Sequence, residues 1–213
     1  MYWSTVTADL KYGLLQFMGN PLFEQFRLVG GTALSLQLGH RMSIDIDLFT
    51  DATYGSVDFG EIDNYLRANY EYVSPSQLPK IVAMGVSYIV GKTRQDSFKL
   101  DLYYTDQFVR PVLNVEGVRM APVEDIIAMK VDVVQRGGRK KDFWDLHELM
   151  DRYSIKQMIS LHKERYPYSH DEALIRRNFT NFSIADEDFD PECLKQKHWE
   201  IVKLDIVEAI KND

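Results

Sequence analysis

The sequence predicts an α+β protein, in which a small mixed β-sheet flanked by helices precedes a purely helical C-terminal part. Up to about residue 120, segments with the two-residue period of strands alternate with segments of helical period. From Pro122 onward the pattern is helical, and no internal repeat or low-complexity tract interrupts the chain. These observations predict a core over residues 1–119 and a helical C-terminal subdomain over residues 120–213.

Hydrophobic periodicity gives the elements in order. Helices are expected where apolar residues recur every three or four positions, and strands where apolar and polar residues alternate. Gly30 and Gly31 make a tight turn between a strand and a helix, and Gly39 ends that helix. By these criteria, strands are expected over residues 26–29, 43–49, 86–90 and 98–104, and helices over residues 5–18, 32–38, 57–68, 123–134, 143–150, 154–165, 170–179 and 194–211.

Composition and charge exclude several classes of protein. The 213 residues include a single cysteine, Cys193, so neither an intrachain disulfide nor a zinc module is supported, and a reducing cytoplasmic location is expected. No secretory leader and no long apolar run is present, which argues against secretion and against a membrane partner. The net charge of −7 argues against a broad basic face, so any contact with a polynucleotide must be local.

Asp45 and Asp47 lie two residues apart on an expected strand, so both side chains leave the same face of the sheet. Their Cα atoms are roughly 6.5 Å apart at about 3.3 Å per residue, and two carboxylates this close repel unless a cation lies between them. Magnesium is the natural candidate, because it takes oxygen ligands and is usually bound by one or two carboxylates together with substrate phosphates. Taken alone, the pair also fits a solvated strand face, which is the commoner case.

Two further features extend this pattern. Gly30 and Gly31 stand between a strand and a helix, where backbone N–H groups and the helix N-terminus favour a phosphate; alternatively they only make the turn. They match neither the dinucleotide-binding nor the P-loop pattern. Asp101 shares one face of another expected strand with Lys99, and it is either an edge-strand polar residue or a third carboxylate that completes a two-metal site.

The order Gly30-Gly31, Asp45-Ile46-Asp47-Leu48 and a later strand with Asp101 resembles the DNA polymerase β type nucleotidyltransferase superfamily. More narrowly, the stretch GGTALSLQLGHRMSIDIDLF, with Lys130 and KKDFWDLHEL, is similar to the AbiEii/AbiGii family of nucleotidyltransferase toxins of type IV toxin–antitoxin and abortive-infection systems. The similarity covers roughly residues 26–150. The resemblance implies a nucleotidyltransferase core whose active site is completed by the helical C-terminal subdomain.

The resemblance also implies roles for particular residues. Asp45, Asp47 and Asp101 would be the catalytic carboxylates and would ligate two Mg²⁺ ions, with Asp101 also a candidate general base. Without the resemblance, Lys130 is a lysine on a largely apolar helix that either pairs with an anion or reaches solvent. Gly30, Gly31 and Thr32 would hold terminal phosphate oxygens, and Lys130 would contact the triphosphate. The full set of implied nucleotide-binding residues is Gly30, Gly31, Thr32, Arg41, Ser43, Lys130, Lys141, Asp142 and Asp145.

Residues 136–145, RGGRKKDFWD, combine four basic residues with Asp142 and Asp145 at helical spacing. Without the resemblance, this is a solvated loop followed by a helix whose first turn contains Asp142. With it, the segment forms part of the active-site wall, and Arg136 and Lys140 are available for nucleotide or RNA phosphates. The acidic segment 185–192 is expected to be solvated, and it would repel RNA.

The sequence therefore favours a Mg²⁺-dependent enzyme that transfers NMP from an NTP to a hydroxyl acceptor and releases pyrophosphate. The resemblance implies a tRNA 3′ end as the acceptor and a cognate antitoxin as a partner. A protein hydroxyl as acceptor, as in AMPylation, is an alternative with the same chemistry. A non-catalytic nucleotide-binding module is the alternative from a different class of protein.

Overall fold

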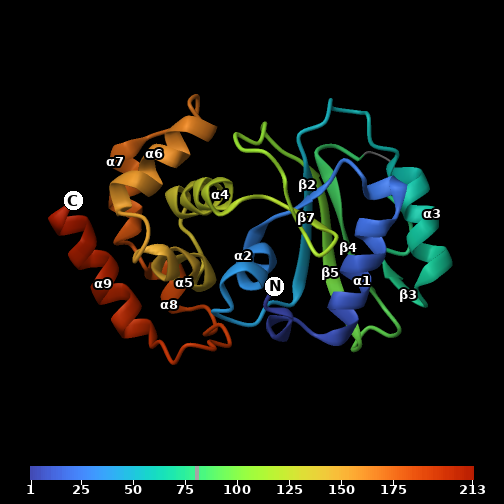
Figure 1. The fold of residues 1–213 in the computed structure, drawn as a ribbon, viewed down its shortest axis with the longest axis horizontal. Coiled ribbons are helices and arrows are strands. Elements are labelled where there is room, and N and C mark those ends of the chain that lie inside the picture. The colour runs from blue at the N-terminus through green and yellow to red at the C-terminus, as the bar shows by residue number, and fades with distance from the viewer. Residues whose placement is uncertain (80–81) are drawn as a thin grey trace.

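The computed structural model describes residues 1–79 and 82–213, and these form a seven-stranded mixed sheet with helices on both faces (Figure 1). Across the sheet the strands follow the order β3-β4-β5-β2-β1-β7-β6. The expected α+β class is confirmed. The strands are β1 (Arg27–Leu28), β2 (Asp45–Thr50), β3 (Tyr72–Ser74), β4 (Gly85–Gly91), β5 (Ser97–Tyr104), β6 (Leu113–Val115) and β7 (Val118–Met120).

Two parallel strands in the middle of the sheet determine the geometry of its polar face. β2 pairs with β5 in a register that puts Asp45 opposite Lys99 and Asp47 opposite Asp101. β4 continues the sheet antiparallel to β5, with Ser87 opposite Asp101. Because side chains alternate along each strand, one face of these strands is buried and apolar and the other carries the polar residues.

The apolar face of the sheet is covered by α1 (Ala8–Gly19) and α3 (Phe59–Asn69), which lie on the same side of it in Figure 1. Each helix begins at a side-chain cap, because Thr7 and Asp58 accept hydrogen bonds from backbone N–H groups of the first turn. Aromatic and aliphatic side chains fill the space between these helices and the sheet. Burial of this face directs the carboxylates of β2 and β5 to the other side.

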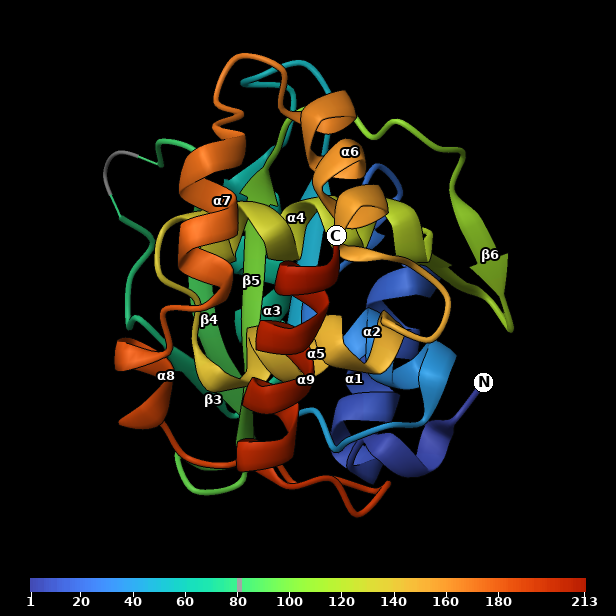
Figure 2. The same ribbon diagram turned by 90° about the vertical axis from the view of Figure 1, so that its left-hand side faces the viewer.

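The opposite side of the sheet is covered by α2 (Gly30–Leu38) and by the helices that follow β7. α4 is the centre of this layer, because α2, α5, α6 and α7 all pack against it. Figure 2 shows the C-terminal helices in front of β4 and β5. Their bounds are α4 (Val123–Gln135), α5 (Lys140–Leu149), α6 (Ile155–Arg165), α7 (Glu172–Phe179), α8 (Ser183–Asp186) and α9 (Trp199–Asn212).

Most of the expected elements are present, and the differences concern their ends. The helix expected over residues 32–38 begins at Gly30, so both glycines belong to its first turn. The strand expected over residues 43–49 begins at Asp45, because the Ser43 N–H donates to the Thr5 carbonyl instead of to a neighbouring strand. Ile44 is consequently 66% exposed rather than part of the core.

Three strands were not expected from the sequence. β3, β6 and β7 have three residues each, which is too short for a periodic pattern to be recognised. The strands end with Met120 and the helical layer follows from Val123, while the division at residue 119 into a core and a separate subdomain stays a prediction. Within the described part of the chain, no helix has the length and apolar character needed to cross a membrane.

Candidate active site

Three carboxylates meet on the polar face of the central strands. Asp45 and Asp47 extend from β2, and Asp101 extends from β5 directly opposite Asp47. Residues in register on paired strands have neighbouring side chains on the same face. The fold therefore brings the three acidic residues expected from the sequence onto one face, two from one strand and one from the next.

This group of carboxylates is short of positive charge. Burial, together with the neighbouring Asp101 and Asp45 carboxylates, raises the pKa of Asp47 to about 6. One oxygen of Asp101, Oδ1, is buried and has no hydrogen-bond partner among the described residues. A buried oxygen of this kind is costly unless a donor or a cation satisfies it. Both observations indicate a position where a cation would bind.

Two lysines lie at the edge of the group. Lys99, opposite Asp45, donates a hydrogen bond of 2.5 Å to Asp101 Oδ2, and its side chain is 43% exposed. Lys141, from the first turn of α5, lies 3.5 Å from Asp45 Oδ2. Three carboxylates facing two ammonium groups leave one negative charge uncompensated, which a further cation would offset.

The donor set suits Mg²⁺, because hard divalent cations prefer carboxylate oxygens. Asp45, Asp47 and the unpartnered oxygen of Asp101 are the groups that would hold it. In residues 1–79 and 82–213, no three His, Cys, Asp or Glu side chains are already arranged around one ion position. The ion pair of Lys99 with Asp101 agrees with this, since a lysine and a metal ion compete for the same carboxylate.

Gly30 and Gly31 form the first turn of α2 directly against this group. Gly30 has a φ of +67°, and a Cβ at this position would overlap the Asp47 carboxylate. A Cβ on Gly31 would overlap the guanidinium of Arg41. The N–H groups of a first helical turn have no acceptor inside the helix, so this turn presents donors beside the carboxylates. The two glycines therefore allow the turn, and they also allow the side chains of Asp47 and Arg41 to lie directly against the backbone of α2.

Thr32 and Ser43 are both buried, and their hydroxyl oxygens are 2.8 Å apart in a hydrogen bond. The Thr32 hydroxyl also donates to the backbone carbonyl of Asp45. The two hydroxyls thereby connect the start of α2 to the start of β2. Their expected contact with a nucleotide stays a prediction.

A second cluster of charges joins α4 and α5 to the loop before β2. We define the buried quartet as Arg41, Lys130, Asp142 and Asp145. Arg41 donates two hydrogen bonds to Asp145, of 2.6 Å and 2.8 Å. Lys130 Nζ lies 2.6 Å from Asp142 and 2.9 Å from Asp145. The ring of His40, which the sequence analysis did not single out, lies 2.8 Å from Asp145 through Nε2.

The buried quartet is electrically balanced. Burial alone would raise the pKa of Asp145, but Lys130 and Arg41 hold that pKa well below its ordinary value. Burial alone would also lower the pKa of Lys130, which Asp142 and Asp145 instead raise above its ordinary value. Two cations and two anions thus satisfy one another inside the protein. The expected contact of these four side chains with a nucleotide stays a prediction.

The basic residues at the start of α5 are paired with the acidic segment that follows α8. Arg139 donates hydrogen bonds of 3.0 Å and 2.9 Å to Asp188. Lys140, with a side chain only 7% exposed, lies 2.7 Å from Asp190. The expectation of a fully solvated acidic segment is therefore wrong for Asp188, which is 16% exposed and paired. Arg139 and Asp188 are 49 residues apart, so no local pattern indicates their contact.

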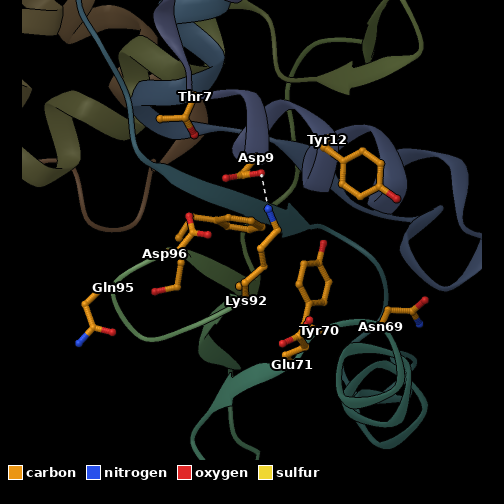
Figure 3. Close-up of a pocket in the computed structure, with 12 residues that line it drawn as sticks. Thr7, Asp9, Tyr12, Asn69, Tyr70, Glu71, Lys92, Gln95 and Asp96 are labelled. Carbon is orange, nitrogen blue, oxygen red and sulfur yellow. Dashed lines mark ion pairs between the residues drawn. The ribbon is translucent and has the colours of Figure 1, made fainter.

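A separate cavity lies on the other side of the sheet (Figure 3). It has a volume of about 410 Å³ and lies between α1, the end of α3 and the hairpin that joins β4 to β5. Phe98 contributes to its wall, and the alternation along β5 points Phe98 away from the face of Asp101. Lys92 and Asp9 face one another across it at 3.9 Å. None of the expected site residues lines this cavity.

Comparisons with solved structures identify the same fold elsewhere. The structure is similar to that of JHP933 from Helicobacter pylori, with a TM-score of 0.56 at 20% identity over 97% of this chain and 92% of that chain. It is also similar to MenT4, a nucleotidyltransferase toxin from Mycobacterium tuberculosis, with a TM-score of 0.54 at 11% identity over 96% of this chain and 83% of that chain. These similarities show the fold.

Sequence comparisons then identify the family. An uncharacterized protein of Aquifex aeolicus, aq_aa25, is 29% identical over 189 residues, which is 84% of this chain and 82% of that protein. The family described as nucleotidyl transferase AbiEii toxin, type IV TA system, matches residues 14–212. The chain belongs to this family and is a nucleotidyltransferase. The resemblance first seen between residues 26 and 150 is thereby confirmed, and it extends through the C-terminal helices.

Proposed function

We propose that this chain uses Mg²⁺ to transfer a nucleoside monophosphate from an NTP to the hydroxyl at a tRNA 3′ end, as the toxin of a type IV pair with a cognate antitoxin. Membership of the AbiEii family supports nucleotidyl transfer by a toxin. The observation that carries the proposal is the register of β2 and β5, in which Asp101 lies opposite Asp47. The tRNA acceptor and the antitoxin follow from the family resemblance.

In this proposal Asp45, Asp47 and Asp101 hold Mg²⁺. Bound Mg²⁺ would offset the negative charge that develops on the leaving pyrophosphate. The raised pKa of Asp47 and the unpartnered oxygen of Asp101 support this role, because both reflect carboxylates that lack sufficient positive charge.

The reaction joins the acceptor hydroxyl oxygen to the α-phosphorus and breaks the bond from that phosphorus to the oxygen bridging to the β-phosphate. The bridging oxygen leaves as part of pyrophosphate with the electron pair of the broken bond. We assign the hydroxyl proton to Asp101 as general base. The first-turn N–H groups of Gly30, Gly31 and Thr32 would donate to terminal phosphate oxygens, and Lys141 would add a cation beside them.

The buried quartet has a supporting role in this proposal. Asp145 connects Arg41, before β2, to Lys130 on α4, and Asp145 itself belongs to α5. The same helix begins with Lys140 and Lys141, so the quartet holds Lys141 against Asp45. Precise positioning of this kind contributes to catalysis because small displacements of reacting groups are costly.

The test measures how much labelled nucleotide the variants Asp45→Asn and Asp47→Asn transfer to an acceptor. Asp9→Asn, on the other side of the sheet, is the matched control. Each protein is incubated with each labelled NTP, total RNA and total protein, in Mg²⁺ or in EDTA. The two site variants should lose transfer to background, because each removes a charged ligand without changing side-chain size. Asp9→Asn should retain it. Transfer retained by both site variants would refute the assignment.

The same assay separates the acceptors. Label in the RNA fraction supports the tRNA end, whereas label in the protein fraction supports a protein hydroxyl acceptor. Calorimetry that shows NTP binding indifferent to Mg²⁺, with no label transferred to either fraction, supports a non-catalytic nucleotide-binding module.

A further inference from the structure

Lys99 is a charged residue of the site to which the proposed mechanism gives no role. It stands two residues before Asp101 on β5 and opposite Asp45 on β2, so its side chain shares the face of the three carboxylates. Its ammonium donates to Asp101 Oδ2 at 2.5 Å, while Oδ1 of the same carboxylate has no partner among the described residues. Asp101 thus has one oxygen neutralised by a lysine and one left bare.

The Lys99 ammonium is held by the whole group of carboxylates. It pairs with Asp101 at 2.5 Å, and the register of β2 and β5 puts Lys99 opposite Asp45 and Asp101 opposite Asp47. The positive charge therefore lies on the face that all three carboxylates share, where it offsets part of their negative charge.

Lys99 is also free to leave that position. Its side chain is 43% exposed, whereas the Lys130 side chain in the buried quartet is 8% exposed. A lysine has a flexible stem and a strongly hydrated head, so Lys99 can turn its ammonium into water without leaving a buried unpaired cation. Lys130 cannot do so, because its departure would strand charges inside the protein.

We propose that Lys99 is a built-in counter-ion of the carboxylate group, whose ammonium on Asp101 Oδ2 competes with a divalent cation that binds the unpartnered Oδ1 of the same carboxylate. The inference rests on the proposed function and specifies how its metal site is regulated. Before metal binds, Lys99 offsets part of the negative charge of the three acids, and it thereby weakens the binding of metal to the free enzyme. Lys99 is thus a residue that acts through Asp101.

Lys141 provides an internal comparison. Its ammonium also faces this group, 3.5 Å from Asp45 Oδ2, and its side chain is 36% exposed. Removing either lysine takes one positive charge from the same carboxylates. If only the overall electrostatic potential matters, removing either lysine should raise the affinity for a divalent cation by a similar factor. If Lys99 competes with the cation for Asp101, its removal should raise that affinity much more than removal of Lys141.

The experiment measures Mn²⁺ binding to the full chain without nucleotide, from the electron paramagnetic resonance signal of the free ion. The proteins are the wild type, Lys99→Met, Lys99→Arg and Lys141→Met. Lys99→Met should bind Mn²⁺ about tenfold more tightly than the wild type or better, because the competing cation is gone. Lys99→Arg, which keeps the charge, should stay within about threefold of the wild type, and Lys141→Met should gain no more than about threefold.

Equal affinities of the wild type and Lys99→Met, or an equal gain in Lys141→Met, would overturn the competition between Lys99 and the metal while leaving the proposed metal-dependent transfer intact. Absence of Mn²⁺ binding by all four proteins would overturn the inference, whereas the labelled-NTP assay tests the proposed function separately. If Lys99→Met unfolds without metal, its thermal unfolding is followed along a Mn²⁺ titration. A steeper rise of Tm than in the wild type supports the inference, and an equal rise contradicts it.

Discussion

In the buried quartet, Arg41 and Lys130 face two aspartates inside the protein, whereas on β2 and β5 three aspartates face two half-exposed lysines. Both clusters combine aspartates with basic residues, and they lie beside one another, since Gly30 approaches Asp47 and Gly31 approaches Arg41. One is complete without any ligand, because each charge has a partner of opposite sign. The other retains an unpartnered oxygen at Asp101 and a raised pKa at Asp47.

The difference shows how charge balance and exposure together distinguish charges that satisfy one another from charges that remain without a full set of partners. Balanced, buried charges join elements that are distant in the chain. Removing one of them leaves its partner buried without a counter-charge, which lowers the free energy of unfolding by several kcal/mol. Unbalanced charges at a half-exposed face retain affinity for a ligand, at the expense of stability. The same substitution, Asp to Asn, should therefore have opposite effects on stability in the two clusters.

The largest effect on stability is expected for Asp145→Asn. This change leaves Arg41 and Lys130 facing a neutral amide, so the free energy of unfolding should fall by about 3–5 kcal/mol in urea titrations at neutral pH. Because the folded-state pKa of Asp145 lies below its unfolded value near 3.9, the stabilisation is present above that pH and is lost as the pH falls below it. A loss under about 1 kcal/mol would contradict the role of the quartet.

A smaller effect of opposite sign is expected for Asp47→Asn in EDTA. The folded-state pKa is about 6, above an unfolded value near 3.9, so wild-type stability falls as the pH rises between these values. The Asn variant lacks this loss, and at pH 8 it should be more stable than the wild type by roughly 1–2 kcal/mol. The comparison of the two clusters fails if urea titrations at pH 8 show the variant to be less stable.

The smallest effect is expected for Asp188→Asn, which breaks an ion pair of a third kind, balanced but partly exposed. The Arg139 side chain is 59% exposed, so the loss of stability should be about 1 kcal/mol or less and should shrink further at high salt. Urea titrations at low and high salt measure it. A loss as large as that of Asp145→Asn would show that burial does not distinguish the two pairs.

Much of the carboxylate group could be predicted from the sequence. Asp45 and Asp47 share a face because side chains alternate along a strand, and Asp101 lies on a strand of the same type. Lys99 has the same spacing from Asp101, so the pattern already contained it, but spacing cannot show which carboxylate oxygen an ammonium binds. The expected start of the strand was wrong. The alternation of apolar and polar residues extends back to Ser43, but pairing with β5 begins only at Asp45.

The buried quartet and the pairing of the basic with the acidic segment could not be predicted in this way. Arg41 and Asp145 are 104 residues apart, and Arg139 and Asp188 are 49 apart. A sequence shows that these side chains are charged, but it does not show which of them are paired or buried. The short strands β3, β6 and β7 were missed because three residues are too few for a periodic pattern, and β3 and β7 are defined by their pairing with β4 and β1.

The sequence by itself determined the fold class, the family and the three acids on two strands, because hydrophobic period, turn-forming glycines and motif order are properties of neighbouring residues. Only the tertiary structure decided which charges neutralise one another and which stay available to a ligand. That decision depends on burial and on distances between side chains far apart in the chain, and both exist only once the sheet and the C-terminal helices have packed together.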